Sequence, residues 1–446
     1  MTVRFVAVRP RLLRIAFVAV IAGSILLLAG RAAVTVRDAE LSDFRCFYEA
    51  ARIVGTGHDP YDRSIWADAT KQDPARLPPC PDTFAYPLWT AMAMAPLAVV
   101  PEPVALAVWE AVLLLCLLGA VALLSRTWQL AGDGNLLLLI LLFSEPTFSA
   151  IANAQLGPVV LLGLAAVAYA LERGRVRVAA AAWALLLMKP NIVVLAIAGL
   201  PMLARSRRFA GHIAVDAIVI TIASLALVRS WPIDVVREIL GQRLLADLGL
   251  GTLSAAAQSA GLPAAVGIGV SVAALTGFAL SLPRRAFRPR ELVAVLAIAS
   301  FLITPYARPH DEVALAVCWA AALACADRST GRQRSVVRAA VVGTAIVLPW
   351  AVTLLSLAGG PLAAHVLTIL ASAGLVVYAL RRVGPPTSAG PDGRSWPGAG
   401  PDQAEKRPSQ IRSQPPAAPA ARIAAAARRQ PRAKAQSAGV IGVSRQ

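Results

Sequence analysis

Charge is scarce in this sequence, and acidic residues are especially few. Only 15% of the 446 residues are charged and 25 are Asp or Glu, whereas 57% are hydrophobic. The mean hydropathy is +0.64. A chain this apolar does not fit one or two soluble domains. We therefore predict an all-α polytopic membrane protein, because helices satisfy their own backbone hydrogen bonds inside a bilayer.

Several chemical motifs are missing. The sequence has no Cys-x-x-Cys, His-x-x-x-His or Glu-x-x-His spacing, so it predicts no zinc or di-iron site. It also lacks the glycine-rich loops that bind ATP or a dinucleotide. We expect neither a cofactor nor a divalent metal.

Cysteine is also rare, at five residues. Cys116, Cys318 and Cys325 lie in apolar segments, where small packing residues are expected. Cys46 and Cys80 share a hydrophilic segment, which would permit a disulfide in an oxidising compartment. The sequence leaves open whether that bond forms.

The net charge of +18 comes from arginines gathered between the apolar segments. The clusters lie at residues 172–177, 205–208, 283–290, 328–338 and 381–382. This is the pattern of cytoplasmic loops in membrane proteins. It favours topology signals over a nucleic-acid-binding surface, and we expect no nucleic acid partner.

These clusters define a topology with both termini in the cytoplasm. Residues 12–30 fit either a cleaved signal peptide or a retained first span, and we favour retention. Residues 31–85 then form an external loop with nine acids, and the proline-bracketed residues 86–100 form a re-entrant segment. A second external loop covers residues 229–261.

The remaining apolar segments bring the predicted total to about twelve spans. They are residues 104–124, 135–143, 158–171, 178–204, 209–228, 262–282, 292–303, 313–325, 339–357 and 362–380. Residues 178–204 are expected to be a hairpin of two short helices, because Lys189-Pro190 interrupts them.

The chain divides into a membrane domain, residues 1–382, and a tail, residues 383–446. The tail holds ten prolines and ten basic residues, so we expect it to be disordered and cytoplasmic. It is either idle or bound to anionic lipid.

The first external loop contains a helical pattern. Its apolar face is expected to consist of Phe44, Phe47, Tyr48, Ala51 and Val54, with glycines 55 and 57 ending the helix. We expect this helix to lie at the membrane surface. Asp43 falls at its first turn, where it is either a helix cap or a catalytic acid.

The other polar residues near the spans fall on the external side of this topology. They are Tyr48, Asn153, Gln155, Lys189, Asn191, Gln258, Ser259, Arg308, His310 and Asp311. Ionisable groups at membrane depth are costly and are usually functional. The pattern predicts an extracytoplasmic site.

An ordered set of short motifs resembles the family 87 glycosyltransferases of actinobacteria. It comprises Asp43, Phe44-x-x-x-Tyr48, Gly57-x-x-Pro60-Tyr61, Phe84-Ala85-Tyr86-Pro87 with Pro96, Asn153-x-Gln155, Met188-Lys189-Pro190, Gln258-Ser259 and Pro309-His310-Asp311. The chain departs from many relatives in having Leu88 where they have a second proline. It also has a single acid, Asp43, where many enzymes of the GT-C class carry a pair.

The resemblance implies a GT-C fold and a polyprenyl-phosphate sugar donor, with a lipoglycan or cell-wall polysaccharide as acceptor. It also implies an inverting transfer at the outer face of the plasma membrane, among membrane lipids. We expect Asp43 to act as the base and His310 as a second catalytic residue. Donor phosphate and sugar contacts are expected from Lys189, Arg308, Tyr48, Gln155, Gln258 and Ser259, and a lipid groove from Tyr86, Trp89 and Met92.

The sugar is open at this stage. Mannose is favoured because family members commonly use it, as in α-1,2-mannosyltransferases, and arabinofuranose is the alternative. A lipid or small-molecule transporter also needs polar residues within many spans, although no repeated halves are visible here. A noncatalytic assembly partner is a further alternative.

Overall fold

The computed structural model describes residues 30, 42–70, 80, 84–130, 132–203, 206–241, 251–358 and 362–382. These residues form helices and connecting turns, with no strand among them. The all-helical prediction is confirmed for this part of the chain. The predicted first span, except Gly30, and the predicted tail lie outside the described residues.

Five of the described helical segments have the length and apolarity needed to cross a membrane. They are α5 (Glu102–Trp128), α11 (Arg207–Leu227), α14 (Ala264–Ser281), the continuous segment Gly331–Leu357 and the segment Ala363–Arg382. A sixth is obtained if α6 (Gly134–Phe143) and α7 (Glu145–Ala152), which meet at 54°, count as one bent span. The structure does not confirm the predicted total of twelve, which stays a prediction.

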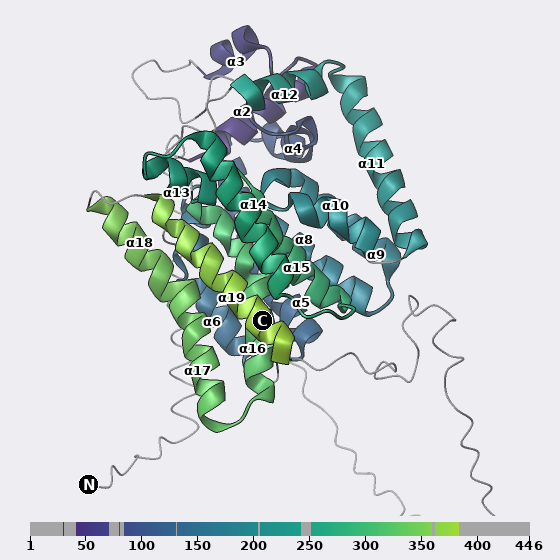
Figure 1. Ribbon diagram of the computed structural model, residues 1–446. Helices are drawn as coiled ribbons and strands as arrows, with labels where there is room; N and C mark the ends of the chain where they lie inside the picture. The colour runs from purple at the N-terminus through teal and green to yellow at the C-terminus, as the bar shows by residue number, and fades with distance from the viewer. Residues whose placement is uncertain are drawn as a thin grey trace, which may run out of the picture. The chain divides into compact units, whose positions relative to one another are not determined.

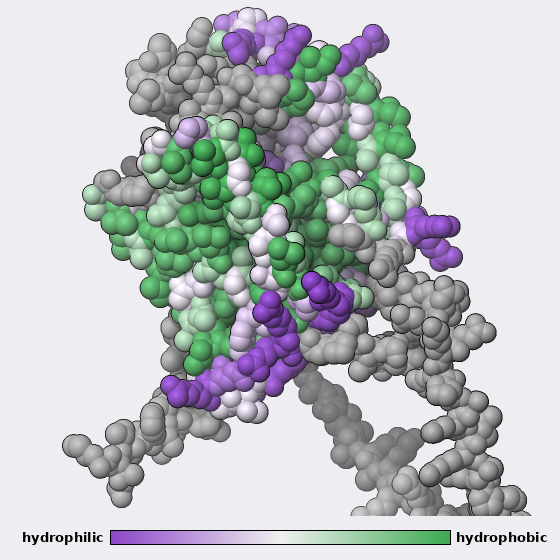
Figure 2. Space-filling model, viewed as in Figure 1, coloured by the Kyte–Doolittle hydropathy of each residue, from purple (hydrophilic) through white to green (hydrophobic). Residues whose placement is uncertain are grey.

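The last two spans contain several helical elements each. Gly331–Leu357 comprises α17 (Gly331–Val342), a π-helical turn η7 (Gly343–Val347) and α18 (Leu348–Leu357). The final span comprises η8 (Leu362–His365) and α19 (Val366–Arg382). Figure 2 shows a broad hydrophobic region across the face in view, with hydrophilic residues above and below it, as expected for a membrane protein.

Three shorter helices are mostly buried in the bundle: α8 (Gly157–Glu172), α15 (Pro289–Ile303) and α16 (Ala316–Arg328). A fourth, α9 (Val176–Ala184), is buried on one face only. The approach of α8 to α9 depends on Gly163, where an added Cβ would lie 3.2 Å from the Ala182 carbonyl oxygen. Small residues permit such close packing between helices in membranes.

The first described helix, α2 (Phe44–Gly55), confirms the predicted helix and its end at Gly55. Phe44, Phe47 and most other side chains of α2 are buried, because α2 packs against α4 (Leu88–Met94) and η2 (Ala95–Val99). A disulfide joins Cys46 to Cys80. The predicted position of α2 at the membrane surface stays a prediction.

The predicted re-entrant segment is a short broken helix, formed by α4 and η2 and bracketed by Pro87 and Pro101. The predicted hairpin is also broken where expected. It contains η3 (Leu185–Met188), Lys189, η4 (Pro190–Ile192) and α10 (Val194–Leu203).

The gap between the predicted spans 135–143 and 158–171, and the second predicted external loop, contain helices of their own. Residues 145–152 form α7, because Ser144 accepts a hydrogen bond from the Thr147 N–H and caps the helix. The second predicted loop includes α12 (Trp231–Gly241) and α13 (Leu253–Ser259). In Figure 1, α2, α4 and α12 lie at the same end of the bundle as α3 (Arg63–Thr70).

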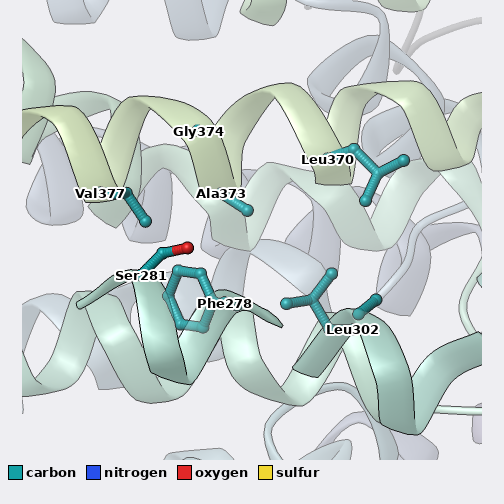
Figure 3. A pocket seen from close by; sticks show the side chains of 8 residues that line it. Phe278, Ser281, Leu302, Leu370, Ala373, Gly374 and Val377 are labelled. Atoms are coloured by element: carbon teal, nitrogen blue, oxygen red, sulfur yellow. The ribbon is translucent and has the colours of Figure 1, made fainter. Parts of the chain in front are cut away.

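An apolar groove of about 300 Å³ lies between α14, α15 and α19. Figure 3 shows Phe278 and Ser281 of α14 facing Ala373 and Val377 of α19. None of the predicted site residues lines this groove.

Candidate functional site

Five predicted polar residues meet in the interior. Gln155 donates a hydrogen bond through Nε2 to Asp43 Oδ2 and accepts one at Oε1 from Lys189 Nζ, at 3.0 Å. Lys189 Nζ also lies 2.7 Å from Asp311 Oδ1 and 3.5 Å from His310 Nε2. We call Asp43, Gln155, Lys189, His310 and Asp311 the polar cluster.

Asp43 stands at the N-cap position of α2, yet its side chain makes no capping hydrogen bond. The helix-cap interpretation of this carboxylate is therefore wrong. Burial of Phe44 and Phe47 fixes the start of α2 against the bundle and directs the Asp43 carboxylate to Gln155.

Gln155 is presented by an unusual turn after α7. Ala154 has a φ of 50°, in the left-handed region that residues other than glycine rarely adopt. The buried indole of Trp109, on α5, donates to the Ala154 carbonyl at 2.8 Å, and the Gln155 N–H donates to the Ala150 carbonyl at 2.8 Å. These bonds hold a turn that costs conformational energy on its own.

Lys189 lies at the break between η3 and η4. Pro190 has no N–H to donate, so the carbonyls that end η3 need partners from elsewhere. Trp89 donates to the Leu187 carbonyl at 2.7 Å and Thr90 donates to the Met188 carbonyl at 3.1 Å, both from α4. The short helix α4 thus stabilises the break that places Lys189 in the interior.

His310 and Asp311 belong to a buried 3-10 helix, η6 (Pro309–Leu315). The carboxylate of Asp311 accepts from the Arg308 N–H at Oδ2, at 3.0 Å, and faces Lys189 with Oδ1. Asp311 therefore fixes both the start of η6 and the lysine ammonium.

Tyr86 and Arg308 border the polar cluster. The Tyr86 hydroxyl lies 3.5 Å from Gln155 Oε1, and Lys189 Nζ lies 5.8 Å from the centre of the Tyr86 ring. The partly buried Arg308 donates from Nε to the Tyr306 hydroxyl at 3.4 Å. Asn191 donates to the Tyr306 carbonyl at 2.8 Å and fixes this loop to the broken hairpin.

Burial shapes the acid–base character of the cluster. It raises the pKa of the Asp43 carboxyl above its ordinary value, while the Gln155 hydrogen bond and the charges of Lys189 and Arg308 oppose that rise. Burial also lowers the pKa of His310 to about 3, against the attraction of Asp311. His310 is therefore a neutral imidazole at physiological pH, and Asp43 holds its proton more strongly than an exposed aspartate.

Other predicted site residues have different surroundings. The Tyr48 hydroxyl donates to the Val100 carbonyl at 2.8 Å, and the exposed Ser259 hydroxyl donates to the Ala255 carbonyl of its own helix at 2.9 Å. Gln258 is partly buried on α13. Among the described residues, no hydrogen bond or ion pair joins any of these three to the polar cluster.

The residues predicted to line a lipid groove are divided between two places. Tyr86 contacts the polar cluster, whereas Trp89 packs edge to face on Trp231 of α12 with ring centres 5.0 Å apart. Met92 accepts a hydrogen bond at Sδ from Ser224 of α11, at 3.4 Å. The lipid-binding role of all three stays a prediction.

Sequence reasoning missed Trp109, Glu145, Glu312 and His365. Trp109 and His365 lie in predicted spans, Glu145 lies in a predicted gap between spans, and Glu312 directly follows the His310-Asp311 motif, so no local pattern marked them. Within the described residues, no group of three His, Cys, Asp or Glu side chains is placed to hold a metal ion.

Comparison with known proteins gives one family match. Residues 84–305 match the model of glycosyltransferase family 87. This region carries Tyr86, Gln155 and Lys189, whereas Asp43 precedes it and His310 follows it. No curated protein and no solved structure gives a significant match. The family match confirms the resemblance seen in the sequence motifs, and the chain belongs to glycosyltransferase family 87, as a membrane glycosyltransferase.

Proposed function

We propose that the protein transfers a sugar, mannose first among the candidates, from a polyprenyl-phosphate donor to a lipoglycan or cell-wall glycan at the outer face of the plasma membrane. The observation that carries this proposal is the Asp43 carboxylate, which makes no helix cap and lies beside Gln155, Lys189 and Arg308. An acid held among cations and amide donors suits a transfer in which one group takes a proton and another binds phosphate.

Asp43 is the base of this mechanism. An acceptor hydroxyl is a weak nucleophile until a carboxylate within hydrogen-bond reach removes its proton during attack on the anomeric carbon. Oδ2 of Asp43 is held by Gln155, and no described residue makes a hydrogen bond to Oδ1. Oδ1 is therefore the oxygen that receives the proton. Direct displacement inverts the anomeric centre, which gives an α-linked product from a β-linked donor.

The leaving group changes from a phosphodiester to a phosphate monoester and gains negative charge. Arg308 is partly buried and influences Asp43 electrostatically, so its guanidinium is the phosphate contact best placed at the edge of the cluster. Lys189 contributes less, because Asp311 already compensates its charge. His310 acts as a neutral hydrogen-bonding group rather than a cation.

Two observations support the outer face. Helix α15 starts at Pro289 in an arginine cluster of cytoplasmic type and ends five residues before Arg308. Its 15 residues span about 22 Å, which separates the arginine cluster from the polar cluster. The Cys46–Cys80 disulfide, close to Asp43 in sequence, fits an oxidising compartment.

The identity of the transferred sugar is tested with purified protein in liposomes. Radiolabelled polyprenyl-phosphate mannose and polyprenyl-phosphate arabinofuranose are supplied in parallel reactions, each with a panel of lipoglycan and cell-wall acceptors. Transfer of mannose with inversion supports the proposal. Transfer of arabinofuranose alone identifies the alternative sugar and contradicts the mannose assignment.

The same liposomes test the transporter alternative. Uptake of labelled donor into the lumen, with no labelled glycan formed in any of the reactions, contradicts the proposed transferase activity. No specific observation in the structure favours that alternative, and the family match is to a glycosyltransferase.

A further inference from the structure

The turn that carries His310 continues into another buried acid. His310, Asp311 and Glu312 follow one another in η6, and all three are at least nine-tenths buried. A 3-10 helix has about three residues per turn, so consecutive side chains point in different directions. Asp311 faces Lys189, whereas Glu312 faces His365 at the C-terminal end of η8.

Glu312 belongs to a second group of buried polar residues that the proposed mechanism does not use. Glu312 Oε1 lies 3.5 Å from His365 Nδ1, and Thr353 Oγ1 of α18 lies 3.1 Å from His365 Nε2. The charge of His365 attracts Glu145, from α7, whereas Glu145 and Glu312 repel each other when both are ionised. The exposed fractions of Glu145, Glu312 and His365 are 5%, 1% and 0%.

This arrangement joins η6 to three parts of the bundle that are far apart in sequence. Glu145 comes from α7, Thr353 from α18 and His365 from the start of the last span. His365 Nδ1 and Glu312 Oε1 lie close without a hydrogen bond of good geometry, and the contact becomes an ion pair when His365 is protonated. Loss of either side chain would leave the other buried with fewer polar neighbours. The position of Glu312 determines that of Asp311, because the two are adjacent in one short turn.

Tight packing on two sides leaves η6 little room to shift. A Cβ added at Gly157, at the start of α8, would lie 2.9 Å from the His310 carbonyl oxygen. A Cβ added at Gly251 would lie 3.0 Å from His365 Cβ and 3.5 Å from Glu312 Oε1. The Gly251 N–H also donates to the Ala307 carbonyl, just before η6, at 2.9 Å.

We propose that the buried pair of His365 and Glu312, with Glu145 beside it, is a positioning device for sugar transfer: it fixes η6 so that Asp311 holds Lys189 and His310 stays beside Lys189 in the polar cluster. His365 and Glu312 act through the turn and do not touch the substrate. The inference rests on the proposed function, since it concerns the same transfer reaction.

The test measures kcat and KM for donor and acceptor in liposomes, together with thermal stability, for four variants. His365→Phe removes both ring nitrogens, and His365→Asn keeps an amide that replaces Nδ1 opposite Glu312. Glu312→Gln keeps the shape of the side chain without its charge. His212→Phe makes the same chemical change on α11 and is the matched control.

We expect His365→Phe and Glu312→Gln to lower kcat by about 10- to 100-fold with little change in either KM, because a misplaced catalytic group slows chemistry more than binding. His365→Asn is expected to recover most of kcat, and His212→Phe is expected to match the wild type.

A normal kcat in His365→Phe, accompanied only by lower thermal stability, overturns the inference. If His365→Phe does not accumulate in the membrane, Glu312→Gln decides the matter, since a normal kcat there also overturns it. Asp43→Asn, measured alongside, separates this outcome from failure of the proposed function. Full activity in Asp43→Asn contradicts the base mechanism itself, whatever the His365 variants do.

Discussion

The Lys189 ammonium lies 2.7 Å from the Asp311 carboxylate, and neither side chain is more than 1% exposed. This ion pair joins the break of the hairpin to η6, two segments separated by more than 100 residues. The pair changes the interpretation of Lys189. Its first role is to compensate Asp311 and orient the Gln155 amide, which in turn binds Asp43.

Lys189→Met is expected to lower the free energy of unfolding by about 3 to 5 kcal/mol, because it leaves Asp311 charged and unpaired in the interior. The double variant Lys189→Met/Asp311→Leu is expected to regain much of that loss. Denaturant unfolding in detergent compares the two. A double variant as unstable as the sum of both single variants contradicts a direct pairing.

The fall in rate at acidic pH is expected to follow the protonation of the Asp43 carboxylate. Its raised pKa means that the carboxylate becomes protonated, and the base is lost, at a pH above the usual value of about 3.9. Because Lys189 lowers the pKa of Asp43, Lys189→Met is expected to move this fall in rate to higher pH. The measurement is kcat/KM against pH for both proteins. A fall in rate that stays in place or moves to lower pH contradicts the electrostatic link.

Reduction of the Cys46–Cys80 disulfide is expected to lower stability by about 3 to 4 kcal/mol, from the entropy of the 34-residue separation that it closes. The Cys46→Ser/Cys80→Ser variant is expected to unfold earlier and to lose activity at a lower temperature than the wild type. Thermal inactivation curves with and without reductant measure this. Equal curves indicate that the bond contributes nothing to the position of α2.

Trp109→Phe tests the turn that presents Gln155. Loss of the indole donor leaves the Ala154 carbonyl without its partner and is expected to cost about 1 to 3 kcal/mol, with a several-fold loss of transfer activity. Trp350→Phe removes an indole bond of the same length, from Trp350 to the Phe143 carbonyl, at an exposed position, and is the control for loss of an indole donor. Equal activity losses in the two variants contradict a specific role for the turn.

Local patterns in the sequence predicted local structure well. Helical spacing from Phe44 to Val54 identified α2, glycine 55 marked its end, and Pro190 marked the break of the hairpin. These features depend on a few neighbouring residues, so they can be predicted from the sequence without knowledge of the fold.

Features that depend on contacts between distant segments were harder to predict from the sequence. Residues 145–152 were expected in an external gap because the topology set by the arginine clusters required one there, yet Glu145 interacts with Thr353 of α18 and His365 of η8, about 200 residues later. The motifs placed Gln155 and Lys189 in one site. Only the structure shows that Lys189 donates a hydrogen bond to Gln155 and that Gln155 donates one to Asp43. Charge pairing of Lys189 with Asp311, rather than with a phosphate, likewise depends on side-chain packing.

The rate of sugar transfer by Asp43→Asn tests the central claim most directly. The matched control is Asp68→Asn, an exposed acid on α3 in the same N-terminal region. With a polyprenyl-phosphate sugar donor, the Asp43 variant is expected to lose at least about 100-fold in kcat while the control keeps the wild-type rate, because removing a general base costs that much. A correctly inserted Asp43→Asn protein that transfers sugar as fast as the control contradicts the assignment of Asp43 as the base.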